Sequence, residues 1–185
     1  MAAVPPICDF GWKAIDATLP GTDGQMHSIF QHKGENGLVV AFICNHCPYV
    51  KAVVARMVRD AKDLAEKGIG FVAICSNDAD AYPADSFDNM KLFANENGFT
   101  FPYLHDADQS VARAWDAVCT PDFFGFNSDM ELQYRGRIDA SRKDAGSADL
   151  KRDLYDSMVM VAETGSGPRE QIASMGCSIK WKEAA

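Results

Sequence analysis

The sequence predicts an α/β fold in which helices flank a central mixed β-sheet. Residues 38–43 (LVVAFI) and 69–76 (IGFVAICS) are continuous apolar runs with β-branched residues, a pattern typical of strands buried on both faces. A helical pattern follows each run, and residues 122–139 alternate as a β-hairpin does. Strands and helices in this order indicate a mixed sheet. A chain of 185 residues predicts one domain, residues 1–185.

The amino-terminal half contains a hairpin and two strand-helix units. Residues 22–24 (TDG) form a turn between two short strand-like runs, which predicts an amino-terminal β-hairpin extension. After the first buried strand, apolar residues fall on one helical stripe from Val50 to Leu64, and Lys67 and Gly68 end that helix. The second buried strand leads through a polar loop to a helix over residues 85–96.

The carboxyl-terminal half is predicted to add shorter elements and a final helix. Residues 99–104 indicate a short strand and residues 109–117 a short helix. A turn at residues 127–129 joins two strands, 122–126 and 131–139, into a hairpin. An amphipathic pattern over residues 148–163 predicts the last helix.

Charge and hydropathy exclude several classes of partner. The net charge is −8 and the pI is about 4.9, and phosphate binding needs a basic face, so we expect no nucleic-acid partner. The longest uncharged apolar stretch, residues 37–50, is too short to span a bilayer, so we expect no membrane partner. The first residues have no signal-peptide pattern. We therefore expect a cytoplasmic protein, whose six cysteines are thiols, metal ligands or catalytic groups rather than structural disulfides.

The stretch CNHC, from Cys44 to Cys47, is the candidate reactive site. It follows directly on a buried strand, and Pro48 suits the first turn of the next helix. Backbone N–H groups and the helix dipole favour an anion at such a place. We therefore expect Cys44 to have a lowered pKa and to act as the nucleophile, and Cys47, one turn further in, to resolve the mixed disulfide. Asn45 and His46 lie between them, and His46 could stabilise the thiolate further.

Two other interpretations of this cysteine pair were weighed. One is half of a zinc site, although no second CxxC or HxxxH follows in the sequence. The other is two inert buried thiols. The placement between strand and helix favours redox chemistry over both, and we expect no metal and no cofactor.

Six segments of the chain resemble one family. They are FICNHCPYVKA, SNDADAYPADSFDNMK, FPYLHD, CTPDFFGF, YRGRID and MGCSIKW, spread over residues 10–181. With them the chain resembles the thioredoxin superfamily, and within it the peroxiredoxin-like alkyl hydroperoxide reductase/thiol-specific antioxidant (AhpC/TSA) branch. The resemblance implies a thioredoxin-like fold with Cys44 in the place of the nucleophile. It also implies that Thr120 and Pro121 form the cis-proline turn that faces the CxxC and holds substrate backbone.

The chain departs from both family patterns at informative positions. The strand before the CxxC has no buried acid, and Ile43 stands where thioredoxins have a Trp. In the peroxiredoxin pattern Cys47 takes the peroxidatic place, Cys44 replaces the Thr three residues before it, and Pro121 falls about where the Arg is expected. The resemblance therefore implies a redox protein that lacks the peroxidase constellation.

Other candidate residues receive simpler interpretations. The acidic loop that ends with Asp85 and Asp88 fits no EF-hand spacing and is predicted to be solvated, bordering the site at most. Arg137 and Asp139 are predicted to lie on a solvated strand face, and Cys75 in the core. Cys119 could approach the CxxC or turn away from it, and Cys8 receives no role. Cys177 in the tail could pack, act as a third redox thiol or bind a metal.

The sequence thus predicts a thiol–disulfide oxidoreductase that uses the CNHC pair. Its partners would be a disulfide-containing protein or small-thiol substrate and an external thiol reductant. The alternative enzyme is a peroxiredoxin-like antioxidant peroxidase, in which one cysteine becomes a sulfenic acid and the other converts it to a disulfide. The alternative of another class is a non-catalytic module that binds a metal or partner through Cys44, Cys47 and His46 or Cys177.

Overall fold

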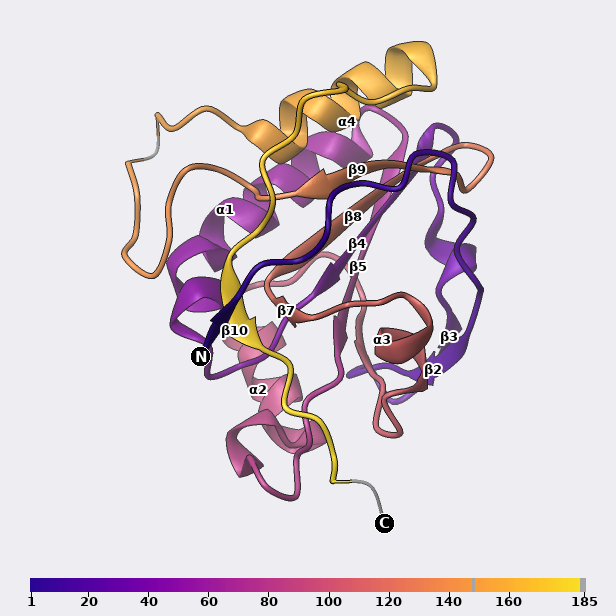
Figure 1. Ribbon diagram of the computed structural model, residues 1–185. Coiled ribbons are helices and arrows are strands. Elements are labelled where there is room, and N and C mark those ends of the chain that lie inside the picture. Colours follow the sequence, from indigo (N-terminus) through magenta and orange to yellow (C-terminus); the bar gives the residue numbers. More distant parts are fainter. Residues whose placement is uncertain (148, 184–185) are drawn as a thin grey trace.

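The computed structural model describes residues 1–147 and 149–183, and a central mixed sheet organises the chain (Figure 1). In this sheet β8 (Asp122–Asn127) pairs antiparallel with both β4 (Gly37–Phe42) and β9 (Leu132–Gly136). On the other side, β5 (Ile69–Cys75) pairs parallel with β6 (Tyr103–His105). β4 lies beside β5, where Ile43 N donates to Ile74 O at 2.9 Å. The mixed α/β sheet predicted from the sequence is confirmed.

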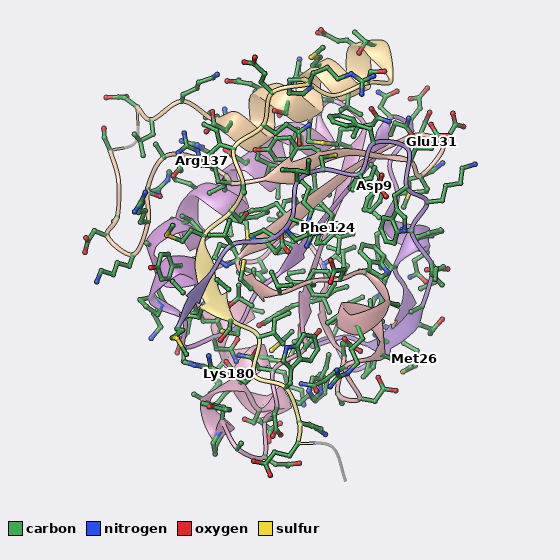
Figure 2. The ribbon with its side chains drawn as sticks, in the orientation of Figure 1. Asp9, Met26, Phe124, Glu131, Arg137 and Lys180 are labelled. Atoms are coloured by element: carbon green, nitrogen blue, oxygen red, sulfur yellow. The ribbon has the colours of Figure 1, made fainter. Side chains whose placement is uncertain are left out.

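Helices cover both faces of the sheet. α1 (Pro48–Ala65) and α4 (Asp153–Thr164) pack on one face, and α2 (Phe87–Glu96) contributes to the same core. α3 (Ser110–Ala114) and the hairpin of β2 (Thr18–Pro20) and β3 (Met26–Ser28) cover the other. Along β4, alternate side chains enter the two cores, because successive residues of a strand point to opposite faces. Figure 2 shows Phe124 in the middle of the molecule, within the second core.

The amino-terminal hairpin, two buried strands and two long helices agree with the sequence-based prediction. Short 3-10 helices also occur at Phe30–His32 and Pro83–Asp85. Residues 99–102 are not a strand, since β6 begins only after Pro102, which has no N–H to donate to a ladder. The last helix begins at Asp153 rather than at residue 148. Residue 148 itself, like residues 184 and 185, lies outside the described residues.

A small second sheet joins both ends of the described chain. Its strand order is β1 (Ala2–Ala3), β10 (Gly176–Ser178) and β7 (Cys119–Thr120). Both of its pairings are antiparallel. In Figure 1 the yellow β10 lies beside the indigo β1 and against the amino-terminal end of α1. This sheet, which the sequence did not predict, brings the tail to the cysteine motif.

Among the helices of the described residues, none is long and apolar enough to traverse a bilayer.

Candidate functional site

The CNHC motif lies where a sheet strand passes into a helix. Cys44 follows shortly after β4, Cys47 is the N-cap residue of α1, and Pro48 occupies the first turn. Proline fits there because its missing N–H would have no helical partner. The strand-to-helix position predicted for the motif is confirmed.

Thr120 and Pro121 lie directly against the two cysteines. The peptide bond between them is cis. Cys44 Sγ is 3.4 Å from Thr120 Oγ1, and the Cys47 thiol can donate to Thr120 O at 3.1 Å. The prediction of a cis-proline turn that faces the CxxC is confirmed, and Thr120 contacts both sulfurs.

Both sulfurs are closed off from solvent. Cys44 and Cys47 each have a relative exposure of 0%. The expectation that Cys44 is the more accessible of the two is therefore wrong for this conformation, because the carboxyl-terminal strand β10 packs against this end of α1. Exchange with a partner requires either a movement or an intermediary sulfur.

The two thiols are electrostatically coupled, and their pKa values shift in opposite directions. The hydrogen bond from Cys44 lowers the pKa of Cys47 to about 5 against the opposing effect of burial, and hydrogen bonds from Cys177 and the Val50 backbone act in the same direction. The pKa of Cys44 is raised by its hydrogen bond to Cys47, by burial and by the charge of Asp85. The N-cap position of Cys47 agrees with this assignment. The raised direction at Cys44 is opposite to the lowered pKa that the sequence led us to expect.

Asp85 is a buried acid that sequence reasoning missed. It is 0% exposed, at the end of the 3-10 helix Pro83–Asp85. Asn45 N donates to its Oδ1 at 2.8 Å, and Asn77 Nδ2 donates to its Oδ2 at 2.8 Å. The expectation of a solvated loop fails here because these donors replace water around the carboxylate. The only signal in the sequence was that the loop follows the carboxyl end of a buried strand.

His46 faces this carboxylate. Its Nδ1 lies 2.7 Å from Asp85 Oδ2, with 31% of its side chain exposed. Its ring stacks on Tyr82, with centroids 5.9 Å apart and an interplanar angle of 2°. Figure 2 shows Lys180 beyond β10 at this end of the molecule, and its Nζ lies 5.8 Å from the Tyr82 ring centroid. A protonated His46 would therefore offset the charge of Asp85 near Cys44.

Asn45 links the motif by hydrogen bonds to the segment at Ala84 and to Tyr103 of β6. Its Nδ2 donates to Ala84 O at 3.0 Å, and its Oδ1 accepts from the buried Tyr103 hydroxyl at 2.9 Å. Together with the backbone bond to Asp85, these contacts fix the loop between β4 and α1. Asn45 is placed here as a positioning residue.

Cys177 approaches the pair from the tail. In β10 it lies opposite Thr120 in register, and it packs against the core cluster that contains Cys44 and Cys47. It is partly exposed, unlike the two motif cysteines. Of the roles left open for it, the structure places it within the site.

Of the remaining cysteines, Cys119 borders the site, and Cys75 and Cys8 lie elsewhere in the fold. All six are free thiols. Cys75 is buried in β5, and burial raises its pKa to about 12. Cys119 donates to Pro121 O at 3.6 Å. Cys8 is partly buried, and burial is the main reason that its pKa rises to about 11.

Arg137 and Asp139 are not on a solvated face. Asp139 is 2% exposed and accepts from Arg56 Nε at 2.6 Å, while Arg137 Nε pairs with Asp153 at 2.7 Å. The loop after β9 folds back over α1, which removes Asp139 from water. Both residues line a cavity of about 280 Å³ that reaches Pro121 and Tyr49.

One group of side chains within the described residues could hold a metal ion. The ligand atoms of Cys44, His46 and Asp85 lie within 4.8 Å of one another. Cys47 and Cys177, which the sequence-based alternative included, are not part of it. Both Asp85 oxygens already accept hydrogen bonds, and a ligating thiol would have to ionise where the pKa is raised. The residues present therefore do not form a ready metal site.

Comparison with known proteins identifies the family. The sequence model of the AhpC/TSA family matches residues 10–135 of this chain. The chain belongs to the AhpC/TSA family. Among solved structures, this AhpC/TSA protein is similar to an uncharacterised conserved protein of Geobacillus kaustophilus, with 43% identity, a TM-score of 0.93, and coverage of 100% of this chain and 98% of that one.

Two further relatives place the AhpC/TSA protein within the superfamily. A Mycobacterium tuberculosis protein provisionally named a peroxiredoxin is 26% identical over 115 residues, which are 62% of this chain and 68% of the relative. The thioredoxin domain of a thiol-disulfide oxidoreductase from Bacteroides vulgatus superposes with a TM-score of 0.64 at 14% identity, over 83% of this chain and 97% of that domain. The protein has the thioredoxin-like fold and is a peroxiredoxin-like member of the superfamily.

Proposed function

We propose that this AhpC/TSA protein is a thiol–disulfide oxidoreductase whose Cys44 and Cys47 alternate between a dithiol and a disulfide. The contact of both sulfurs with one residue, Thr120, supports the proposal most directly. It brings the two thiols together at the turn formed by Thr120 and the cis Pro121. The opposite pKa shifts of the pair also leave one sulfur ready to attack and one ready to follow.

Ionisation favours Cys47 as the sulfur that starts the exchange. Its thiolate attacks one sulfur of a substrate disulfide, a new S–S bond forms, and the other substrate sulfur leaves as a thiolate. Cys44 then loses its proton to that leaving thiolate or to solvent and attacks Cys47. The second substrate thiolate leaves, and Cys44 and Cys47 end as a disulfide. Two electrons have passed from the protein to the substrate.

The neighbours of Cys44 govern the second step. Cys44 needs to be deprotonated while the negative Asp85 carboxylate opposes its ionisation. A protonated His46 at 2.7 Å from Asp85 reduces that opposition. We propose Asn45, His46 and Asp85 as positioning residues, and Thr120 with Pro121 as the surface that receives the partner.

The partners of this exchange are a disulfide-containing protein or small thiol and an external thiol that reduces Cys44 and Cys47 again. We expect this cycle to operate in a cytoplasmic, reducing setting. The chemistry of the two sulfurs is sufficient for it without a cofactor.

Equilibration of the purified protein with glutathione redox buffers tests the proposal. We expect a reversible Cys44–Cys47 disulfide, located by mass spectrometry after acid quench and alkylation, whose fraction follows the buffer potential. Turnover of a small disulfide with dithiothreitol as donor should be lost in Cys44→Ser and in Cys47→Ser. The matched control Cys8→Ser replaces another partly buried thiol outside the site and should keep wild-type turnover. Equal turnover in all four proteins would overturn the proposal.

The lowered pKa of Cys47 also favours a second candidate function, that of a peroxidase. Cys47 takes the peroxidatic place of the family, and a thiolate there could attack a peroxide oxygen. This would give Cys47 sulfenic acid and a water or alcohol, after which Cys44 would form the disulfide and release water. The Thr and Arg of the peroxiredoxin pattern are replaced by Cys44 and Pro121. We therefore expect slow oxidation by hydrogen peroxide in stopped-flow experiments. Rapid, saturable, Cys47-dependent consumption would place the peroxidase first.

A further inference from the structure

The strand β10 occupies the free edge of the cis-proline turn. Cys177 lies opposite Thr120 and Ser178 opposite Cys119 in an antiparallel register. Beyond the strand, Ile179 N donates to Val118 O at 3.0 Å. Figure 1 shows β10 crossing in front of this end of the molecule. An extended segment of another chain could pair with this edge only after β10 left it.

Gly176 keeps this strand close to the turn. A Cβ atom at Gly176 would lie 2.0 Å from Thr120 O and 2.5 Å from Thr120 C. Any larger residue would therefore push β10 away, and Cys177 with it. The close approach is built into the sequence at the position directly before the cysteine.

Accessibility increases from the buried pair to the tail. Cys44 and Cys47 are 0% exposed, whereas Cys177 is partly exposed. Cys177 nevertheless packs against the core cluster that contains both motif cysteines, opposite Thr120, which contacts both of their sulfurs. Of these three cysteines, Cys177 is the one that is partly exposed to solvent in this conformation.

We propose that Cys177 is a third exchange thiol, which passes the disulfide between the buried Cys44–Cys47 pair and a small thiol in solution by forming a transient Cys47–Cys177 disulfide. This inference rests on the proposed function of the pair. It names the sulfur at which a small thiol enters the cycle.

The steps balance without any further oxidant. In the oxidised protein the Cys177 sulfur attacks Cys47 Sγ, so the Cys47–Cys177 bond forms and the Cys44–Cys47 bond breaks. The proton that Cys177 loses ends on Cys44. A solution thiol then attacks the exposed Cys177 sulfur, and Cys47 leaves as a thiolate. A second solution thiol frees Cys177 and takes away both external sulfurs as a disulfide. Two external thiols have become one disulfide, and Cys44 and Cys47 are reduced.

The environment of Cys47 suits the step in which a solution thiol displaces it. Cys47 is a good leaving group because its thiolate is stabilised, and a leaving thiol of lower pKa departs faster. The pKa of Cys44 is raised, so it retains the proton once it has been released. Burial and the neighbouring Cys47 raise the pKa of Cys177 to about 11, and the positive charge of Lys180 acts in the opposite direction. An anionic small thiol such as glutathione therefore suits this entry point.

The first experiment looks for the intermediate directly. Cys44→Ser is oxidised with diamide, quenched in acid and mapped by mass spectrometry. We expect a Cys47–Cys177 disulfide in most molecules, because β10 holds Cys177 opposite Thr120, whose carbonyl oxygen contacts the Cys47 sulfur. Its absence, with Cys47 left as a free thiol, would overturn the inference.

The second experiment measures how fast glutathione reduces the oxidised protein. Cys177→Ser should be reduced at least about tenfold more slowly than wild type, because no accessible sulfur remains. Cys8→Ser, which removes a partly buried thiol outside the contact network, should be reduced at the wild-type rate. Equal rates for Cys177→Ser and wild type would overturn the inference.

The outcomes separate this inference from the proposed function. A wild-type protein that forms Cys44–Cys47 but shows neither effect retains the proposed function and loses the relay. A wild-type protein that never forms Cys44–Cys47 loses the proposed function. Circular dichroism of both variants checks that they are folded, and the Cys47–Cys177 linkage in Cys44→Ser is decisive even if Cys177→Ser is unstable.

Discussion

At the scale of single residues, the lowered pKa of Cys47 and the raised pKa of Cys44 change how the CNHC motif is interpreted. Its position after a strand and before a helix could be predicted from the order of residue types alone. Which sulfur ionises could not, because that depends on Asp85, 40 residues away in sequence, and on Cys177, which only the fold brings to the site. Contacts between distant segments leave no periodic pattern in a sequence.

The first prediction concerns the titration of Cys47. As the pH falls through about 5, the thiolate should take up a proton, so ultraviolet thiolate absorbance of the reduced protein should fall with a midpoint near that pH. Cys44→Ala removes the main hydrogen-bond donor and should move the midpoint to higher pH. The signal should vanish in Cys47→Ser. If it persists there and vanishes in Cys44→Ser, the charge belongs to Cys44.

The second prediction is that substitutions of Asp85 and His46 shift the reduction potential of the cysteine pair in opposite directions. Asp85→Asn removes a negative charge that raises the pKa of Cys44. The reduced form gains stability, and the reduction potential of the pair should rise by about 30 mV, or about tenfold in the exchange constant. His46→Ala leaves the carboxylate without its 2.7 Å partner, so the potential should fall.

Glutathione equilibria measure both shifts of potential. Asp88→Asn is the matched control, because this neighbouring acid is exposed and pairs only with Lys91 among the contacts described. Shifts of the same sign for Asp85→Asn and His46→Ala would contradict this account of the two residues.

At the scale of elements, strong periodic signals gave the right result and weak ones did not. The runs that became β4 and β5 and the stripe that became α1 are long and apolar, so burial dictates their structure. The three-residue β10 has no pattern of its own and exists because β7 and β1 pair with it. The last helix was expected from residue 148, but α4 begins five residues later, at Asp153. Arg152 is the N-cap residue of α4, and its side chain donates to Asp63 of α1 at 2.7 Å.

The third prediction concerns the close packing of β10 against the cis-proline turn. In Gly176→Ala the new Cβ would meet Thr120 O, so the strand should shift outward. Overpacking of this kind costs about 1–3 kcal/mol of unfolding free energy. Alkylation of Cys47 should accelerate, because the strand shields it.

Urea denaturation and site-resolved alkylation measure the two effects of Gly176→Ala. Gly98→Ala is the control, since no atom lies within 4 Å of the Cβ there. Its positive φ of 63° brings some strain but no displacement of β10. Destabilisation without faster alkylation of Cys47 would mean that β10 does not control access to the pair.

At the scale of the whole molecule, the candidate site includes a residue that lies outside the part of the chain matched by the family. The AhpC/TSA family matches residues 10–135, which include Cys44, Cys47 and Pro121. The tail with Cys177 lies outside that range, yet it closes over the reactive end of the matched part. The thioredoxin-like core could therefore be recognised from the sequence, whereas the closure of its site depends on how the chain end folds back.

The last prediction concerns partners trapped in cells, where the two accounts of the exchange differ. If Cys44 attacked partners first, the Cys47→Ser variant would trap partner proteins as mixed disulfides on Cys44. The double variant Cys47→Ser/Cys177→Ser would trap more of them. With Cys177 as the accessible sulfur, Cys47→Ser should hold thiol partners on Cys177, because no Cys47 remains to displace them. The double variant should then lose them. Cys44→Ser should hold few, since Cys47 and Cys177 close on each other.

Affinity purification under acid quench, non-reducing gels and mass spectrometry of the linked peptides distinguish these outcomes. Peptides joined through Cys177 in Cys47→Ser, and their loss in the double variant, are the expected result. A metal-binding module predicts a different set, in which Cys44→Ser and His46→Ala both lose a stoichiometric ion and no variant accumulates covalent partners. Metal analysis of the untagged wild type belongs beside the trapping experiment for that reason. The cysteine that carries the trapped disulfide then shows whether partners react directly with the buried Cys44–Cys47 pair or first with Cys177 in the tail.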